Sequence, residues 1–101
     1  LNSDHSVREL KGHKRPLNIL KDRLEVIAAL EAVDFVTWFG EINPLKIILK
    51  LRPDILVKGG DWDTTKMVGA KEVLSWGGKV FSLPFIKGKS TTQLIKKIIK
   101  L

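Results

Sequence analysis

Short apolar segments alternate with stretches of helical periodicity along most of this chain. Three segments rich in β-branched and aromatic residues have the length of strands, at residues 35–39, 55–57 and 79–83. Apolar residues three and four positions apart, typical of helices, lie between and after them. This alternation predicts an α/β fold, in which a Rossmann-like parallel sheet has helices on both faces. The unbroken apolar run at 55–57 further predicts a strand that is fully buried.

The helices have recognisable boundaries in the sequence. Proline suits the first turn of a helix and also ends one, and glycine commonly follows the last turn. The last helix has the clearest start, because Ser90 is followed three residues later by Gln93, which is the pattern of a capping box. The predicted helices cover residues 6–11 (with a turn as the alternative), 20–32, 44–52, 66–76 and the segment that follows Ser90.

Two short loops leave the carboxyl ends of two predicted strands. The first, residues 58–65, contains Gly59-Gly60, and the second, residues 88–92, opens the last helix. The carboxyl ends of parallel strands share one edge of a sheet, where open α/β sheets bind ligands. Glycines allow a ligand to approach the backbone, and the N–H groups of a helix start attract phosphate. Together the loops predict a nucleotide site, although each loop alone has a plain alternative, a tight turn and a helix cap.

Composition narrows the classes of function. The formal net charge is +7, which suits an anionic small molecule. No aromatic and basic motif supports nucleic acid as the partner, and no apolar run approaches the roughly 20 residues that span a membrane. Cysteine is absent, and His5 and His13 alone make a poor metal set, so we expect no metal site formed by the protein. We expect a cytoplasmic protein, with residues 1–101 forming part of a single domain.

Several motifs resemble one family. They are Asn2-Ser3-Asp4, Leu10-Lys11-Gly12, Arg15-Pro16, Asp22-Arg23, Leu30-Glu31-Ala32-Val33-Asp34, Pro53-Asp54, Leu56-Val57-Lys58-Gly59-Gly60-Asp61 and Ser90-Thr91-Thr92. The chain resembles the cytidylyltransferase-like nucleotidyltransferases over essentially its whole length. In order and spacing the motifs are most similar to the heptose 1-phosphate adenylyltransferase domain of ADP-heptose synthase.

The resemblance implies a reaction and a set of site residues. The reaction is adenylyl transfer from ATP to a sugar 1-phosphate, heptose 1-phosphate, with Mg²⁺, giving pyrophosphate and ADP-heptose for lipopolysaccharide precursor synthesis. Catalysis then rests on positioning and charge stabilisation, without a covalent intermediate. The resemblance places Ser90, Thr91 and Thr92 on the ATP phosphates, Lys58, Gly59, Gly60, Asp61 and Trp62 around the ribose and base, and Lys11 and Arg15 toward the sugar phosphate or pyrophosphate.

One departure from the family pattern is important. The family's catalytic His-x-Gly-His motif, at the end of the first strand, does not occur in this sequence. Residues 1–4 resemble the exit of a strand, so we expect the C-terminal part of a nucleotidyltransferase domain with its first strands missing. We therefore expect this chain alone to be inactive. A strand from another segment, or a homodimer, would fill the gap in the sheet.

Other functions stay open at this stage. The chain is alternatively a non-catalytic nucleotide-binding module, or part of another cytidylyltransferase-like enzyme. A basic nucleic-acid binder is a third and weaker alternative. A strong salt dependence of oligonucleotide binding would favour this last alternative.

Overall fold

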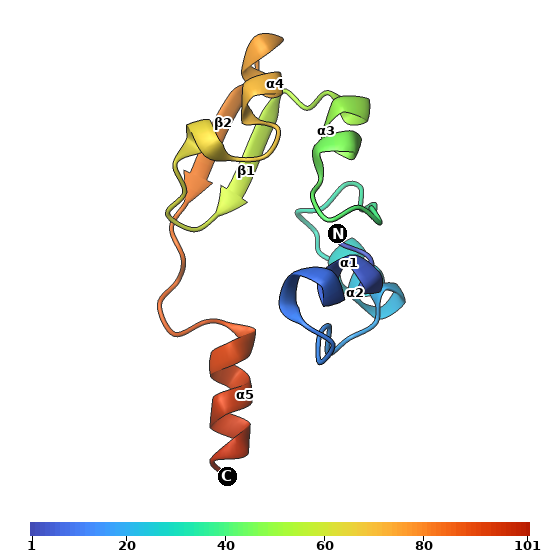
Figure 1. The fold of residues 1–101 in the computed structure, drawn as a ribbon, viewed down its shortest axis with the longest axis vertical. Helices are drawn as coiled ribbons and strands as arrows, with labels where there is room; N and C mark the ends of the chain where they lie inside the picture. The colour runs from blue at the N-terminus through green and yellow to red at the C-terminus, as the bar shows by residue number, and fades with distance from the viewer. The chain divides into compact units, whose positions relative to one another are not determined.

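The computed structural model describes residues Leu1–Leu101, which divide into two compact units, Leu1–Leu51 and Arg52–Leu101. The class predicted from the sequence is confirmed, because helices accompany strands that pair in parallel (Figure 1). In chain order the elements are α1 (Asp4–Lys11), α2 (Leu20–Ala28), α3 (Leu45–Leu51), β1 (Ile55–Gly59), the 3₁₀ helix η1 (Thr64–Lys66), α4 (Ala70–Ser75), β2 (Lys79–Leu83) and α5 (Thr91–Ile99).

In the first unit, the extended residues Leu1–Ser3 run parallel to Thr37–Phe39. The amino group of Leu1 donates to the Thr37 carbonyl at 2.7 Å, and the Phe39 N–H donates to the Leu1 carbonyl at 3.0 Å. The Ser3 N–H then donates to the Phe39 carbonyl at 2.8 Å. The predicted strand over 35–39 is therefore wrong in extent, because only its end finds a partner and the Phe35 side chain is 95% exposed. An apolar run becomes a strand only where a second backbone satisfies its polar groups.

Helix α1 is fixed by local capping and by one buried hydroxyl. The Ser3 hydroxyl accepts from the Ser6 N–H at 3.1 Å, and Gly12 ends the helix with a φ of 93°. Ser6 is fully buried, and its hydroxyl donates to the Glu41 carbonyl at 2.7 Å while accepting from the Asn2 side chain at 2.9 Å. These bonds connect α1 with the loop that precedes α3.

Helix α2 is shorter than its apolar spacing predicts. It ends at Ala28 and not at residue 32. The N–H groups of Ala29 and Leu30 donate to carbonyls three residues back, those of Val26 and Ile27. Such bonds tighten the last turn into a 3₁₀ form and end an α-helix.

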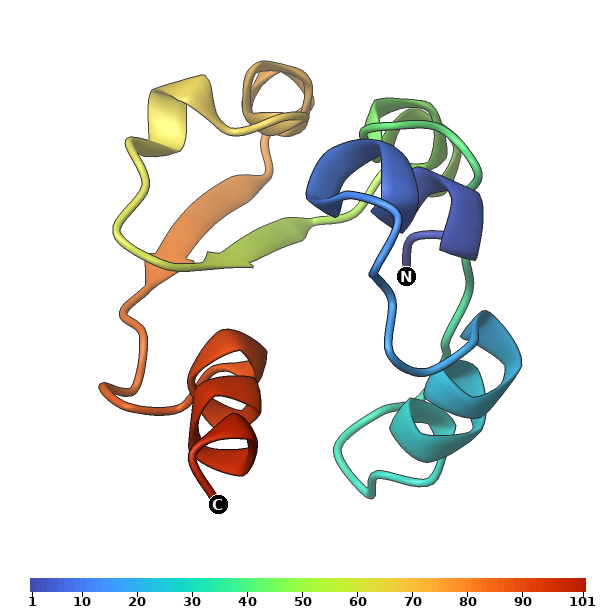
Figure 2. The ribbon, with the colours of Figure 1, turned by 60° about the horizontal axis from the view of Figure 1, so that its bottom comes forward.

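In the second unit, β1 and β2 form a parallel pair (Figures 1 and 2). The register runs from Ile55 opposite Lys79 to Gly59 opposite Leu83, so both strands end at the same edge. Helix α4 packs on this pair and supplies the fully buried side chains of Ala70 and Val73. The unit's small core therefore lies between one helix and two strands.

The segment between the strands differs from the single helix expected over 66–76. It contains η1 and then α4, which starts only at Ala70. Gly69 precedes α4 with a φ of 86°, a left-handed conformation that interrupts helical geometry. At the other end of α4, Gly78 lies so close to Val73 and to the Asp54 carbonyl that a Cβ would meet them at 2.6 and 2.7 Å. Glycine is required there by the close packing of helix on strand.

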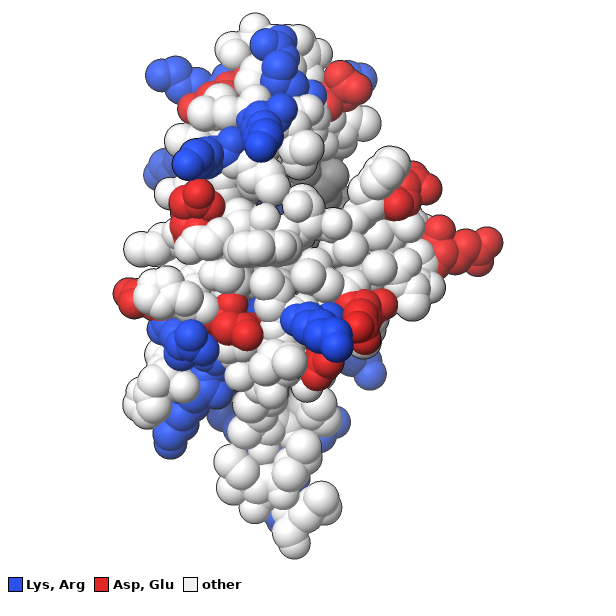
Figure 3. Space-filling view, turned by 90° about the vertical axis from the view of Figure 1, so that its right-hand side faces the viewer, with Lys and Arg blue, Asp and Glu red and all other residues white.

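The predicted full burial of residues 55–57 is wrong in this structure. Ile55 is 56% exposed and Val57 is 50% exposed, because two strands and one helix leave much of the sheet uncovered. Helix α5 likewise carries exposed apolar residues, including Leu94 and Ile98. Much of the surface drawn in Figure 3 belongs to uncharged residues. None of the helices combines the length and apolar character that crossing a bilayer requires.

Candidate functional site

The glycine loop begins at the carboxyl end of β1. The strand continues through Lys58 and Gly59, two residues that the sequence assigned to the loop, and the turn starts at Gly60. The Gly60 N–H donates to the Leu83 carbonyl at 2.6 Å and so extends the pairing with β2 by one bond. Gly60 has a φ of 109°, a backbone conformation that residues other than glycine rarely adopt.

Ser82 on β2 holds this loop in place. Its hydroxyl donates to the Gly60 carbonyl and accepts a bond of 3.1 Å from the Trp62 N–H. This residue was not predicted as part of the site, although it is the one polar side chain in the run Val80–Leu83. A hydroxyl in the middle of an apolar strand usually has a partner, so the signal was present but did not identify the partner.

Trp62 folds back over the end of β1. Its indole N–H donates to the Gly59 carbonyl at 3.0 Å, and the Lys58 ammonium lies 3.8 Å from the centre of the ring, in a cation–π contact. The indole is half exposed, and the ring of Phe85 lies against Gly60. The structure therefore brings Lys58, Gly59, Gly60 and Trp62 together, with the exposed Asp61 between the last two. One positive charge and two aromatic rings surround a backbone turn.

Asp63 organises the next turn. Its carboxylate accepts from the Thr65 hydroxyl at 2.6 Å and from the Thr65 N–H at 3.0 Å. These bonds, the hydroxyl bond foremost, hold the pKa of Asp63 below its usual value. Asp63 thereby caps η1 and closes the segment that leads from the glycine loop into α4.

The second predicted loop forms the start of α5. The Ser90 hydroxyl accepts from the Gln93 N–H at 3.1 Å, which confirms the predicted cap. Beside it lies a hollow lined by Gly88, Lys89, Ser90, Thr91, Gln93, Leu94 and Lys97. Two lysines and the N–H groups of a helix start are suited to an anion. That this hollow and the glycine loop bind parts of one ligand remains a prediction.

The two remaining predicted site residues lie in the first unit. Lys11 is the exposed last residue of α1, and Arg15 is half-buried in the loop that joins α1 to α2. Arg23 of α2 forms an ion pair of 2.7 Å with Asp4 of α1, and not with an acidic residue of its own helix.

The ion pair predicts an acid sensitivity. The hydrogen bond from Arg23 holds the pKa of Asp4 below its usual value. A carboxyl whose pKa is lower in the folded chain stabilises the fold above its unfolded pKa, about 3.9, and this contribution disappears as the pH falls through the folded value. An NMR titration of the Asp4 carboxyl is expected to give a pKa below the usual value for aspartate, about 3.9, and Arg23→Gln is expected to raise this pKa toward that value. An Asp4 pKa that Arg23→Gln leaves unchanged would contradict the contact.

The role of Ser82 is testable by its removal. In Ser82→Ala, the carbonyl of Gly60 and the N–H of Trp62 lose a partner. We expect hydrogen exchange at Gly60 and Trp62 to become several-fold faster, since one hydrogen bond contributes about 1 kcal/mol. Ser75→Ala is the matched control, because that hydroxyl bonds within α4, to the Glu72 carbonyl. Unchanged exchange in Ser82→Ala would show that the loop holds its shape without the hydroxyl.

The parallel strands, the helix packed on them and the loops at their carboxyl ends define a Rossmann-like α/β class. No family model matches the chain. The chain is 54% identical to the bifunctional protein HldE of Koribacter versatilis over 97 residues, which are 96% of this chain and 20% of that protein. It is 49% identical over 100 residues to HldE of Geobacter sulfurreducens, and 46% identical over 99 residues to HldE of Coxiella burnetii.

The chain spans about a fifth of the length of these curated relatives. Nearly all of its residues align at identities of 46–54%, so the chain is a homologue of one segment of the HldE bifunctional proteins. The resemblance to the adenylyltransferase part of ADP-heptose synthase, noted from the motifs, is confirmed.

Proposed function

We propose that this chain carries the nucleotide-binding part of an adenylyltransferase. The reaction transfers the adenylyl group of ATP to heptose 1-phosphate, releases pyrophosphate and yields ADP-heptose. The match to HldE proteins over nearly the whole chain, both loops included, carries this proposal. The geometry supports it, because β1 and β2 end at one edge of the sheet, where α/β sheets bind ligands, and the exposed Gly59 and the half-exposed Trp62 lie at that edge.

In this proposal the residues of the second unit hold ATP. The helix start at Ser90–Thr92 binds the phosphates through N–H and hydroxyl groups, with Lys89 and Lys97 adding positive charge. The glycine loop receives the ribose and base, and Trp62 offers a half-exposed aromatic face. Lys58 already contacts that face, so a base that stacks there displaces the lysine or stacks on the far side.

In this proposal, Lys11 and Arg15 offset the other negative charges of the reaction. They face the sugar phosphate or the departing pyrophosphate. Mg²⁺ enters with the ATP phosphates, since in nucleotide sites it is held largely by substrate oxygens and water. No group of three acidic, histidine or cysteine side chains is placed to hold an ion here. This chain's own contribution is to position both substrates and to offset negative charge.

A chimera tests the proposal. The segment of Koribacter versatilis HldE that matches this chain is replaced by residues 1–101, and pyrophosphate release is measured with ATP and heptose 1-phosphate. We expect release that requires both substrates, as in the parent protein. The 101-residue chain alone is the second arm and is expected to be inactive, because it lacks the paired histidines.

The chimera also separates the proposal from its alternative. A chimera that is folded and binds ATP but releases no pyrophosphate would favour a non-catalytic nucleotide-binding module. A chimera that transfers the adenylyl group to a different phosphorylated acceptor would favour another nucleotidyltransferase. In both cases the assignment to heptose 1-phosphate would be wrong.

A further inference from the structure

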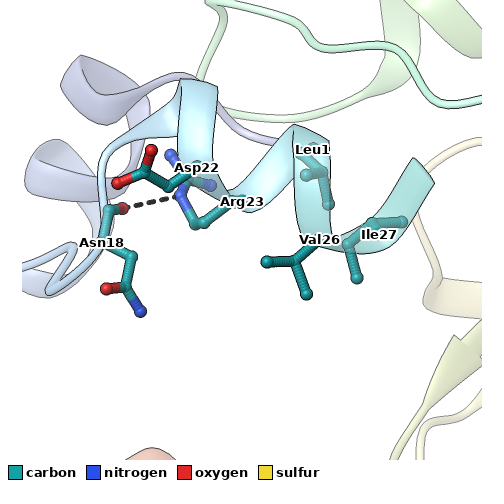
Figure 4. A pocket seen from close by; sticks show the side chains of 6 residues that line it. All are labelled: Leu1, Asn18, Asp22, Arg23, Val26 and Ile27. Carbon is teal, nitrogen blue, oxygen red and sulfur yellow. Dashed lines mark hydrogen bonds between the residues drawn. The ribbon is translucent and has the colours of Figure 1, made fainter. Parts of the chain in front are cut away.

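The guanidinium of Arg23 joins three segments of the first unit. From α2, its Nε donates to the Asn18 carbonyl at 2.9 Å (Figure 4). Its Nη1 donates to the Asn2 carbonyl at 2.9 Å, and its Nη2 donates to the Asp4 carboxylate at 2.7 Å. All three nitrogens are engaged, and the side chain is only 22% exposed.

These bonds join the two ends of a stretch of chain that carries several basic residues. Asn2 and Asp4 lie at the start of α1, and Asn18 lies just before α2. The stretch between Asp4 and Asn18 contains Lys11, Lys14 and Arg15. We name residues 11–15 the basic segment. Both ends of this stretch are therefore held by one side chain.

We propose that Arg23 is the positioning residue of an anion site formed by the basic segment. Arg23 acts by holding the segment and does not contact the anion. Its own charge is already offset by Asp4, so an anion meets the cations of the basic segment and not this guanidinium. The inference rests on the proposed function, which places Lys11 and Arg15 on a phosphate of the sugar or on pyrophosphate.

The direction in which one substitution changes the affinity for the anion distinguishes a positioning role from a simple effect of charge. Asp4→Ala frees the Arg23 guanidinium and makes the net charge more positive by one. If Arg23 bound the anion, or if total charge decided affinity, this variant would bind more tightly. If Arg23 acts by holding the basic segment, the variant binds more weakly, because one of its anchors is gone.

The experiment titrates the 101-residue chain with inorganic pyrophosphate, followed by NMR and calorimetry at fixed pH and ionic strength. We expect Arg23→Gln and Asp4→Ala each to raise the dissociation constant about tenfold, the usual scale for losing a hydrogen-bonded charge. Asp22→Ala is the matched control, since Asp22 is adjacent to Arg23 on α2 but forms no ion pair with it. This control removes the same charge and is expected to bind as tightly as the parent chain, or more tightly.

A second variant distinguishes a specific loss of affinity from a loss of folded structure. Arg23→Lys keeps the charge, but a single ammonium does not reach three separate acceptors. We expect it to bind nearly as weakly as Arg23→Gln, with amide shifts outside residues 1–28 unchanged. A variant that regains parent affinity through lysine would overturn the proposal, and so would tighter binding by Asp4→Ala.

The parent chain and the chimera keep this inference distinct from the proposed function. If the parent chain shows no binding of pyrophosphate at the basic segment, the positioning role of Arg23 is wrong. Adenylyl transfer by the chimera would then still support the proposed function. Conversely, an inactive chimera with the expected order of pyrophosphate affinities would leave the anion site standing without that reaction.

Discussion

Gly60→Val is expected to abolish nucleotide binding while the helices remain folded. Gly60 has a φ of 109°, and a Cβ at this position would lie 2.8 Å from the Phe85 ring and 2.8 Å from the Trp62 indole nitrogen. A branched side chain in this left-handed region adds backbone strain to both overlaps. The turn must therefore open, and the arrangement of Trp62 and Phe85 at the end of β1, where the nucleotide would bind, is lost. Calorimetry with ATP, alongside far-ultraviolet circular dichroism, measures both parts of the expectation.

Gly40→Val is the matched control for this change. A Cβ at Gly40 meets no other atom within 4 Å, and Gly40 is not in the left-handed region. We expect its affinity for ATP to stay within a few-fold of the parent. Normal ATP binding by Gly60→Val would show that the loop is only a tight turn.

The second large effect is expected at the start of α5. Replacing Thr91 and Thr92 with valine in the chimera removes two hydroxyls and preserves shape and β-branching. We expect a higher KM for ATP and a lower kcat, with kcat/KM reduced roughly 10²-fold or more, the scale for losing a preorganised electrostatic contact. Threonine and valine have similar helix propensities, so α5 is expected to persist.

Thr37→Val in the same chimera makes the isosteric exchange far along the sequence, in the first unit. We expect it to leave the kinetics with ATP unchanged. Unchanged kinetics in the Thr91 and Thr92 double variant as well would refute the assignment of phosphates to this helix start. Helical content measured by circular dichroism shows whether α5 remained folded in each variant.

Local chemistry allowed several elements to be predicted closely. β2 was predicted with its observed bounds, because its apolar run lies between Gly78 and Pro84. The start of α5 followed from the spacing of Ser90 and Gln93, and that hydrogen bond forms within one turn. Pro44 and Pro53 similarly bracketed α3. In each case the residues that decide the structure are close neighbours in the sequence.

Contacts between distant residues were beyond such signals. Ser82 bonds to Gly60 and Trp62, which are 22 and 20 residues away, and Arg23 bonds to Asp4, 19 residues away. No local periodicity records which distant carbonyl a hydroxyl or guanidinium reaches. Both residues had a visible signal, a polar group in an apolar strand and an arginine near acidic residues. Only the folded chain identified their partners.

The sequence by itself determined the α/β class, the bounds of β2, the capped start of α5 and the two loops that follow the strands. These depend on backbone preferences and on apolar spacing, which act over a few residues. Only the tertiary structure decided that residues 35–39 pair merely at their end and that β1 is half exposed. It also decided which distant residues Ser82 and Arg23 bind. Burial and pairing depend on which backbone lies alongside, and that is a property of the whole chain and not of any segment.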